Sequence, residues 1–182
     1  MPLSSADRPA IVPVTCFPER LFVNDLQAFG LIGELLAARR GAKSRVRLRR
    51  RLASVGLDWP KLLVLASEQL LTPALAAAVL RLHLLGKGNE ELERYFEGVL
   101  DLNRERNRLI GAQVRAILGV LNPRGIEPIG LKGIAYLLME LFHDRGERVI
   151  GDIDLLVPQD RSGEAVDALI GIGYRLAHGR EH

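Results

Sequence analysis

The chain has 182 residues, of which 48% are hydrophobic and 26% are charged, and its formal net charge is +3. A chain of this length and composition can bury a core, in one domain or two small ones, which argues against wholesale disorder. No apolar run reaches transmembrane length and the N-terminus lacks a signal-peptide pattern, so we expect a cytoplasmic protein that does not contact membranes. The single cysteine, Cys16, excludes an internal disulfide and agrees with that compartment.

The N-terminal two thirds of the chain divide into an arm and a helical region. Residues 1–18 carry four prolines and predict an extended arm. Residues 19–122 show apolar side chains at mixed spacings of three and four, which is typical of a helical bundle. Asp58 is a candidate N-cap ahead of a proline in the first helical turn, and Thr72 precedes Pro73 in the same way.

The longest helix is predicted to begin near Asn89. Glutamates in its first turn complement the positive end of the helix dipole. An apolar stripe follows between residues 92 and 121, where Asn103 and Arg106 interrupt it. Pro123 and a glycine after it predict the end of the helix.

From residue 123 the pattern alternates between strands and helices. In chain order, we expect a strand at IEPIGLKG, a helix at IAYLLMELFHD, a strand at DIDLLV, a helix at DRSGEAVDALIGIG and a third strand starting at YRLAH. The first of these helices is expected to turn Ile134, Leu137, Leu138 and Leu141 inward. The predicted fold class is therefore α+β: an N-terminal helical bundle followed by a partial α/β domain over residues 123–182.

Two carboxylates stand at the start of the second predicted strand. Asp152 and Asp154 are two residues apart, so in a strand both side chains project from the same face. Such a pair repels itself unless a cation lies between the two, and Mg²⁺ is commonly held by one or two carboxylates together with substrate phosphates. We therefore predict that both aspartates are metal ligands and catalytic residues. The alternative is a solvated pair at a turn.

The turn GLKG lies between the first strand and the first helix of this region. Lys132 supplies a point charge, and Gly133 lets a ligand approach the backbone closely. The turn is a candidate phosphate site, because it precedes the carboxylate strand by one helix, as phosphoryl transfer requires. The alternative is an ordinary turn with a solvated lysine.

Four motifs follow one another in the C-terminal third of the chain: GLKG at 130–133, Arg148, GDIDLLV at 151–157 and GYRL at 173–176. Their order and spacing resemble the polymerase-beta-like nucleotidyltransferase superfamily, and more narrowly a poorly characterised bacterial branch of it. The resemblance begins near Gly125. It implies that Asp152 and Asp154 bind Mg²⁺, that Lys132 and Gly133 hold a nucleoside triphosphate such as ATP, and that Arg148 makes a phosphate contact or an ion pair. The implied reaction moves a nucleoside monophosphate to an acceptor.

The chain departs from that superfamily at two places. Ile134 stands where many members have a serine after the glycine of the phosphate turn. The superfamily usually has a third carboxylate on a later strand, for which Asp160, Glu164 and Asp167 are poor substitutes. We therefore expect a catalytic domain that is incomplete at its C-terminus, which leaves two alternatives: a chain that transfers nucleotides, and a chain that binds nucleotide but fails at catalysis. Its unpaired sheet edge would favour a homo-oligomer.

A basic stretch runs from Arg39 to Arg51 and holds eight cationic side chains. It could bind RNA or another polyanion, although it contains no aromatic residues for stacking on bases. The alternative is a solvated helix face that is balanced by acidic neighbours. The stretch also supports a second function class, a non-catalytic module that retains the fold and binds nucleic acid or a protein, including an antitoxin-like role.

Overall fold

The computed structural model describes residues 25–38, 46–48, 50, 52, 58–86 and 88–177. The predicted arm at residues 1–18 lies outside this part of the chain, and so do most of the basic residues between Arg39 and Arg51. Arg47 and Arg50 are described, and both are exposed. No helix among the described residues is both long enough and apolar enough to cross a membrane.

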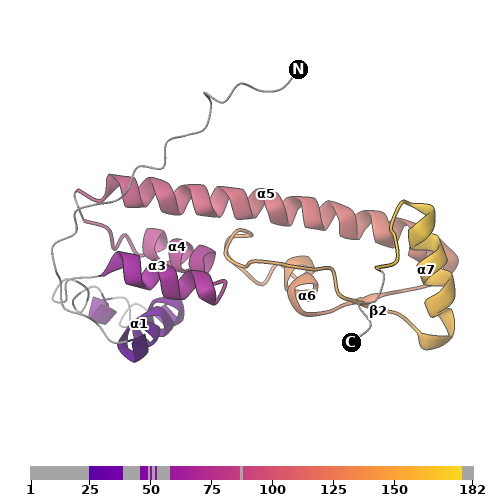
Figure 1. Ribbon diagram of the computed structural model, residues 1–182, viewed down its shortest axis with the longest axis horizontal. Coiled ribbons are helices and arrows are strands. Elements are labelled where there is room, and N and C mark those ends of the chain that lie inside the picture. Colours follow the sequence, from indigo (N-terminus) through magenta and orange to yellow (C-terminus); the bar gives the residue numbers. More distant parts are fainter. Residues whose placement is uncertain are drawn as a thin grey trace, which may run out of the picture.

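The first elements with described bounds are the helices α1 (Asp25–Ala37), α3 (Trp59–Glu68), α4 (Thr72–Arg81) and α5 (Glu90–Leu121). A short helical turn, η2 (Asn122–Arg124), follows them. The elements after it are β1 (Ile129–Gly130), α6 (Lys132–Leu138), β2 (Leu155–Leu156), η3 (Gln159–Arg161) and α7 (Ser162–Gly171). Helix α5 runs along the whole molecule, with α1, α3 and α4 beneath one half and α6, β2 and α7 at the other (Figure 1).

This arrangement confirms the predicted α+β fold class, with a helical N-terminal part and a small sheet in the C-terminal part. The sheet has two antiparallel strands, with Ile129 opposite Leu156 and Gly130 opposite Leu155. Residues 174–177, where we expect a third strand to begin, form no strand. A strand exists only through backbone hydrogen bonds to a neighbour, and β2 has its neighbour β1 on one side.

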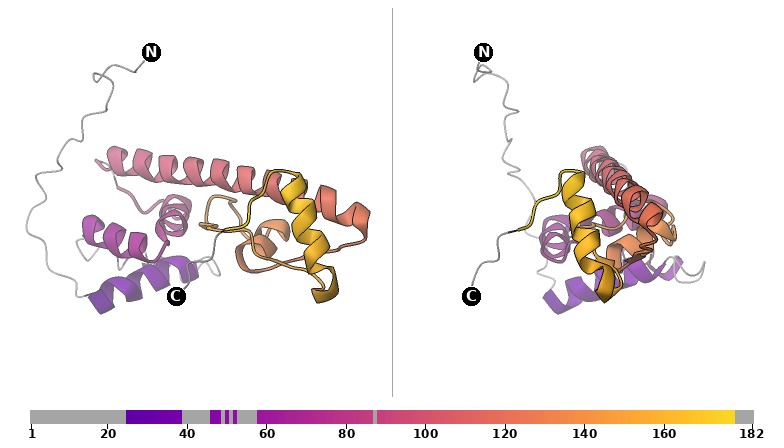
Figure 2. Two further views of the ribbon diagram at one scale, coloured as in Figure 1. Left: turned by 45° about the vertical axis from the view of Figure 1, so that its right-hand side comes forward. Right: turned by 90° about the vertical axis from the view of Figure 1, so that its right-hand side faces the viewer.

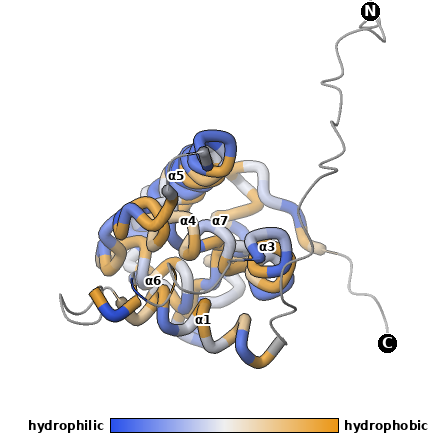
Figure 3. The backbone as a smooth tube through the Cα atoms, turned by 90° about the vertical axis from the view of Figure 1, so that its left-hand side faces the viewer, coloured by the Kyte–Doolittle hydropathy of each residue, from blue (hydrophilic) through white to orange (hydrophobic). Residues whose placement is uncertain are grey.

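The long helix α5 contributes to more than one core. Its first half buries Phe96 and Leu100 against α1, α3 and α4, and its second half buries Val114, Ile117 and Leu121 against the C-terminal elements. Helices α6 and α7 both contact α5, and α7 crosses it near its C-terminal end (Figure 2). Figure 3 looks nearly down α5 and shows both hydrophilic and hydrophobic positions on it, as expected for a helix with one buried face.

The N-terminal core forms where local sequence signals predict it. Asp58 caps α3, because its side chain accepts a hydrogen bond from the Lys61 N–H at 3.1 Å. Thr72 does not act as a cap, since it is already the first helical residue and Leu71 takes the N-cap position. Phe96 is fully buried and meets the edge of Trp59 at 5.8 Å between ring centroids, a contact that adds to its apolar burial.

Helix α6 is shorter than the sequence pattern predicts. It ends at Leu138, and Glu140 adopts a left-handed φ of 51°, which turns the chain away from the helix axis. The expectation that Leu138 and Leu141 point inward is therefore wrong, because their exposed fractions are 50% and 51%. Ile134 is buried, as predicted.

Candidate functional site

The segment around β2 directs its side chains alternately inward and outward. Ile153, Leu155 and Val157 pack against the C-terminal cores. Asp152 is exposed, and the Asp154 side chain is 29% exposed. The backbone therefore places both carboxylates on the outer face, although regular strand begins only at Leu155.

Lys132 lies against these carboxylates. Its Nζ is 2.7 Å from Asp154 Oδ2, and the neighbouring Leu131 N–H donates to the Asp154 carbonyl at 3.0 Å. The hydrogen bond to the Asp154 carboxylate raises the pKa of Lys132, and the charges of Asp154 and Asp152 raise it further. Residues 20 and 22 positions apart in the sequence thus meet at one corner, which we call the Lys132 corner: Lys132, Asp152 and Asp154.

Gly133 has a packing reason to be glycine. A Cβ at this position would lie 3.2 Å from the Cγ2 of buried Ile150, so a larger residue would push α6 away from the core. Lys132, directly before it, has a left-handed φ of 47°. The backbone conformation of the turn thus determines the direction in which the Lys132 side chain projects. A phosphate contact at Gly133 stays a prediction.

Arg148 is not brought to the Lys132 corner. Its guanidinium lies over the ring of Tyr136, 5.2 Å from the centroid, and its side chain is exposed. Among the described residues it forms no ion pair with Asp152 or Asp154. A cation above an aromatic face is a weak but favourable contact, and it keeps Arg148 against α6.

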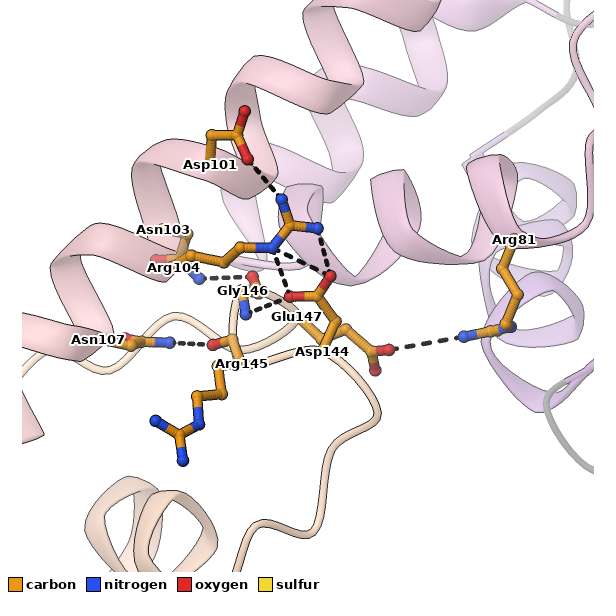
Figure 4. A network of polar contacts seen from close by, with 9 residues as sticks. All are labelled: Arg81, Asp101, Asn103, Arg104, Asn107, Asp144, Arg145, Gly146 and Glu147. Carbon is orange, nitrogen blue, oxygen red and sulfur yellow. Dashed lines mark hydrogen bonds and ion pairs between the residues drawn. The ribbon is translucent and has the colours of Figure 1, made fainter.

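Two asparagines on α5 hold the segment that leads to the aspartates. Asn103 and Asn107 are 7% and 2% exposed, and we call them the asparagine clamp. The Asn103 amide donates to the carbonyls of Gly146 at 2.7 Å and Arg148 at 2.9 Å. The Asn107 amide donates to the Arg145 carbonyl at 2.6 Å (Figure 4) and to the Arg148 carbonyl at 2.9 Å. The clamp therefore binds three carbonyls of one loop.

A charged pair fastens the same loop. Arg104 donates from Nε to Asp144 Oδ1 at 2.9 Å and also contacts Asp101 (Figure 4). The hydrogen bond from Arg104 lowers the pKa of the Asp144 carboxyl, and the Gly146 N–H, which donates to Asp144 Oδ1 at 2.7 Å, lowers it further. The buried loop carboxylate, Glu147, lies 3.5 Å from Arg81 of α4.

Gly146 shows how closely this loop approaches α5. A Cβ at this position would lie 2.7 Å from the Leu100 carbonyl oxygen, so any side chain would force the loop off the helix. The loop is followed by buried Ile150 and then by Asp152. The position of the aspartates thus depends on α5, which the sequence pattern did not reveal, since Asn103 is expected only as an interruption of an apolar stripe.

The oxygen donors at the Lys132 corner suit Mg²⁺. The described residues include no group of three or more His, Cys, Asp or Glu that could hold a metal ion, so this corner offers two carboxylates. Mg²⁺ is often bound by two carboxylates when substrate phosphates and water complete its coordination. Asp152 and Asp154 therefore fit the ion, provided that Lys132 releases Asp154 Oδ2 when a ligand arrives.

Residues 56–182 match a family model described as an uncharacterised nucleotidyltransferase. The matched range includes α3 to α7 and all five predicted site residues: Lys132, Gly133, Arg148, Asp152 and Asp154. It begins well before Gly125, so the helices α3, α4 and α5 are part of the matched unit. No curated protein matches the chain, and no solved structure matches it either.

Proposed function

Because this chain belongs to the family of uncharacterised nucleotidyltransferases, we propose that it transfers a nucleoside monophosphate from a nucleoside triphosphate, with ATP as the first candidate, to an acceptor oxygen. In this reaction the acceptor oxygen bonds to the α-phosphorus, and the bond between the α-phosphate and the β-phosphate breaks to release pyrophosphate. The observation that carries the proposal is the Lys132 corner, where an ammonium and two outward-facing carboxylates meet.

Each member of the corner has a proposed role. Asp152 and Asp154 hold Mg²⁺, which neutralises phosphate charge and polarises the phosphoryl group when it is bound. Lys132 exchanges its contact with Asp154 for the oxygens of the triphosphate, because a lysine side chain that is 72% exposed can rotate to a new partner. Gly133 keeps the turn close to the core, so that the lysine and the carboxylates stay on the same side.

We further propose that the chain is a member of the polymerase-beta-like superfamily. The support is the order of LKG, the arginine at 148 and GDIDLLV, together with an antiparallel pair of strands that joins the first motif to the last. A phosphate contact by Arg148 stays a prediction. The acceptor is a hydroxyl or phosphate oxygen.

Calorimetric titration of ATP, with and without Mg²⁺, tests the assignment. We expect the wild-type chain to bind ATP only when Mg²⁺ is present. The Asp152→Asn/Asp154→Asn variant should bind at least about ten-fold more weakly, which corresponds to about 1.4 kcal/mol of binding free energy. Pyrophosphate release from ATP, measured in the same samples, reports whether binding leads to transfer.

A matched control is Asp160→Asn/Asp167→Asn, which removes the same charge from two exposed aspartates on η3 and α7. This control should bind Mg²⁺-ATP as the wild-type chain does. Equal binding by the wild-type chain and the Asp152→Asn/Asp154→Asn variant would contradict the site. If neither protein bound ATP, the non-catalytic binding module would become the better description.

A further inference from the structure

A cavity of about 360 Å³ lies between the N-terminal helices and the loop that the asparagine clamp holds. This volume is in the range of pockets that bind small organic molecules. Helices α1 and α4 and the turn between α3 and α4 form one wall, and the segment from Phe142 to Val149 forms the other. The Lys132 corner contributes none of the described residues that line the cavity. The cavity is therefore separate from the Lys132 corner, while Arg148, for which a phosphate contact is predicted, is one of its lining residues.

One polar group in this wall is incompletely bonded. Arg81 contacts Glu147 through Nη1 at 3.5 Å, but its Nη2 is buried and has no hydrogen-bond partner (Figure 4). A buried N–H donor without an acceptor costs about 1–3 kcal/mol, so an oxygen that enters the cavity and accepts from Nη2 would recover this free energy. The guanidinium is a planar donor whose geometry matches a carboxylate or a phosphate.

The charge and hydrophobicity of the other lining residues indicate which kind of ligand the cavity fits. Arg81 and Arg148 line the cavity beside its one acidic residue, Glu147. The guanidinium of Arg148 lies over Tyr136, so the donor offered to an anion is Nη2 of Arg81. The other described lining residues are mostly apolar and include Leu36, Leu71, Ala74, Ala78, Phe142 and Val149. An apolar wall around a cationic donor fits a molecule with a hydrophobic body and one oxyanion.

We propose that this cavity binds a small organic anion, a carboxylate or phosphate ester on an aromatic or aliphatic body, with its oxyanion on Arg81. The proposal does not depend on nucleotidyl transfer, because its oxyanion donor, Arg81, and its apolar lining have no part in the proposed reaction. Ligand binding would join α4 to the loop from Asp144 to Arg148.

The test is a titration of the ¹⁵N-labelled chain followed by NMR, with phenyl phosphate and benzoate as the probes. Benzyl alcohol supplies the same kind of ring without the charge, and inorganic phosphate supplies the charge without the ring. We expect amide shifts at Ala78, Phe142 and Val149 with the two aromatic anions, and affinities at least about ten-fold weaker for both controls. The comparison of phenyl phosphate with benzoate identifies which oxyanion the cavity prefers.

Two variants examine the cavity from opposite sides. Arg81→Gln removes the donor and should weaken phenyl phosphate binding about ten-fold. Ala74→Leu fills the apolar side while the ion pair between Arg81 and Glu147 stays intact, so it tests the cavity even where Arg81→Gln fails to fold. Arg106→Gln, an exposed arginine on α5, is the matched control and should bind as the wild-type chain does.

Three results would overturn the proposal. The first is the absence of amide chemical-shift changes at the cavity residues with both phenyl phosphate and benzoate. The second is an unchanged affinity of the Ala74→Leu variant for phenyl phosphate. The third is displacement of phenyl phosphate by ATP, because the cavity would then be part of the nucleotide site. The Asp152→Asn/Asp154→Asn variant should bind phenyl phosphate normally, so a failure of the proposed nucleotidyl transfer would leave this result unchanged.

Discussion

The asparagine clamp and the Lys132 corner hold the two ends of one short segment in different ways. The clamp is buried and donates four hydrogen bonds to carbonyls of the loop. The Lys132 corner depends on one ion pair whose lysine is 72% exposed, together with a backbone hydrogen bond from Leu131. In the enclosed clamp, both amide nitrogens donate to loop carbonyls, whereas the Lys132 corner depends on an exposed lysine.

This difference separates a scaffold from a site that can exchange partners. A buried polar network is costly to disturb, because each carbonyl that loses its donor stays desolvated. An exposed ion pair contributes about 0–1 kcal/mol to stability, so it can open for a ligand at little cost. We therefore expect mutations in the clamp to act on stability and mutations in the Lys132 corner to act on binding.

The largest effect on stability is expected from Asn103→Leu/Asn107→Leu. Leucine is similar in size to asparagine but offers no donor, so three loop carbonyls lose their bonds to α5. The free energy of unfolding should fall by about 3 kcal/mol or more, as measured by urea denaturation. Gln113→Leu, at an exposed amide on the same helix, should change it by less than about 0.5 kcal/mol. Similar values for the two variants would contradict the clamp.

A smaller, pH-dependent effect is expected from Asp144→Asn. Because Arg104 lowers the pKa of Asp144 in the folded chain, the pair stabilises the fold above the unfolded pKa of about 3.9 and loses this contribution as the pH falls through the folded value. Arg104 is 45% exposed, so solvent screening limits the effect at pH 7 to about 1 kcal/mol.

Urea unfolding of the wild-type chain and Asp144→Asn between pH 2.5 and pH 7 measures this effect. The two stability curves should converge as the pH falls below about 4, since the wild-type carboxyl is then increasingly protonated. Asp160→Asn, at an exposed aspartate of η3, is the control and should follow the wild-type curve. A constant gap between the wild-type chain and Asp144→Asn at every pH would show that the charge of Asp144 is not involved.

The smallest effect on stability is expected from Lys132→Ala, within about 0.5 kcal/mol of the wild-type chain. Alanine tolerates the left-handed backbone at this position about as poorly as lysine, so the backbone strain is similar in both proteins. The affinity for Mg²⁺-ATP should nevertheless fall about ten-fold, and Lys132→Arg should restore part of it. A large loss of stability with unchanged ATP affinity would reverse the contrast between the two assemblies.

Local patterns in the sequence predict much of the helical part. The periodicity and the acidic first turn place α5 correctly, and the Asp58 cap of α3 is confirmed, because both signals act over a few residues. The end of α6 is not predicted, since the apolar pattern continues to Leu141 while the backbone turns at Glu140. A hydrophobic pattern carries no information about such a turn.

Contacts between distant residues account for the rest. Asn103 meets Gly146 across 43 positions of sequence, and no rule of spacing joins an asparagine in an apolar stripe to a glycine in a later loop. The proximity of Lys132 to the aspartates follows from the order of strand, helix and strand, but its ion pair with Asp154 does not. A second asparagine one turn after the first, at Asn107, was the available signal for the clamp.

The continuity of α5 restricts how this chain can change in length. The helix has 32 residues without a break, and its buried positions face the N-terminal helices, the loop and the C-terminal cores in turn. One inserted residue between Leu100 and Val114 would rotate everything beyond it by about 100° and shift it by about 1.5 Å. Insertions and deletions in relatives should therefore collect in the connections between elements, while the residue count along α5 is preserved.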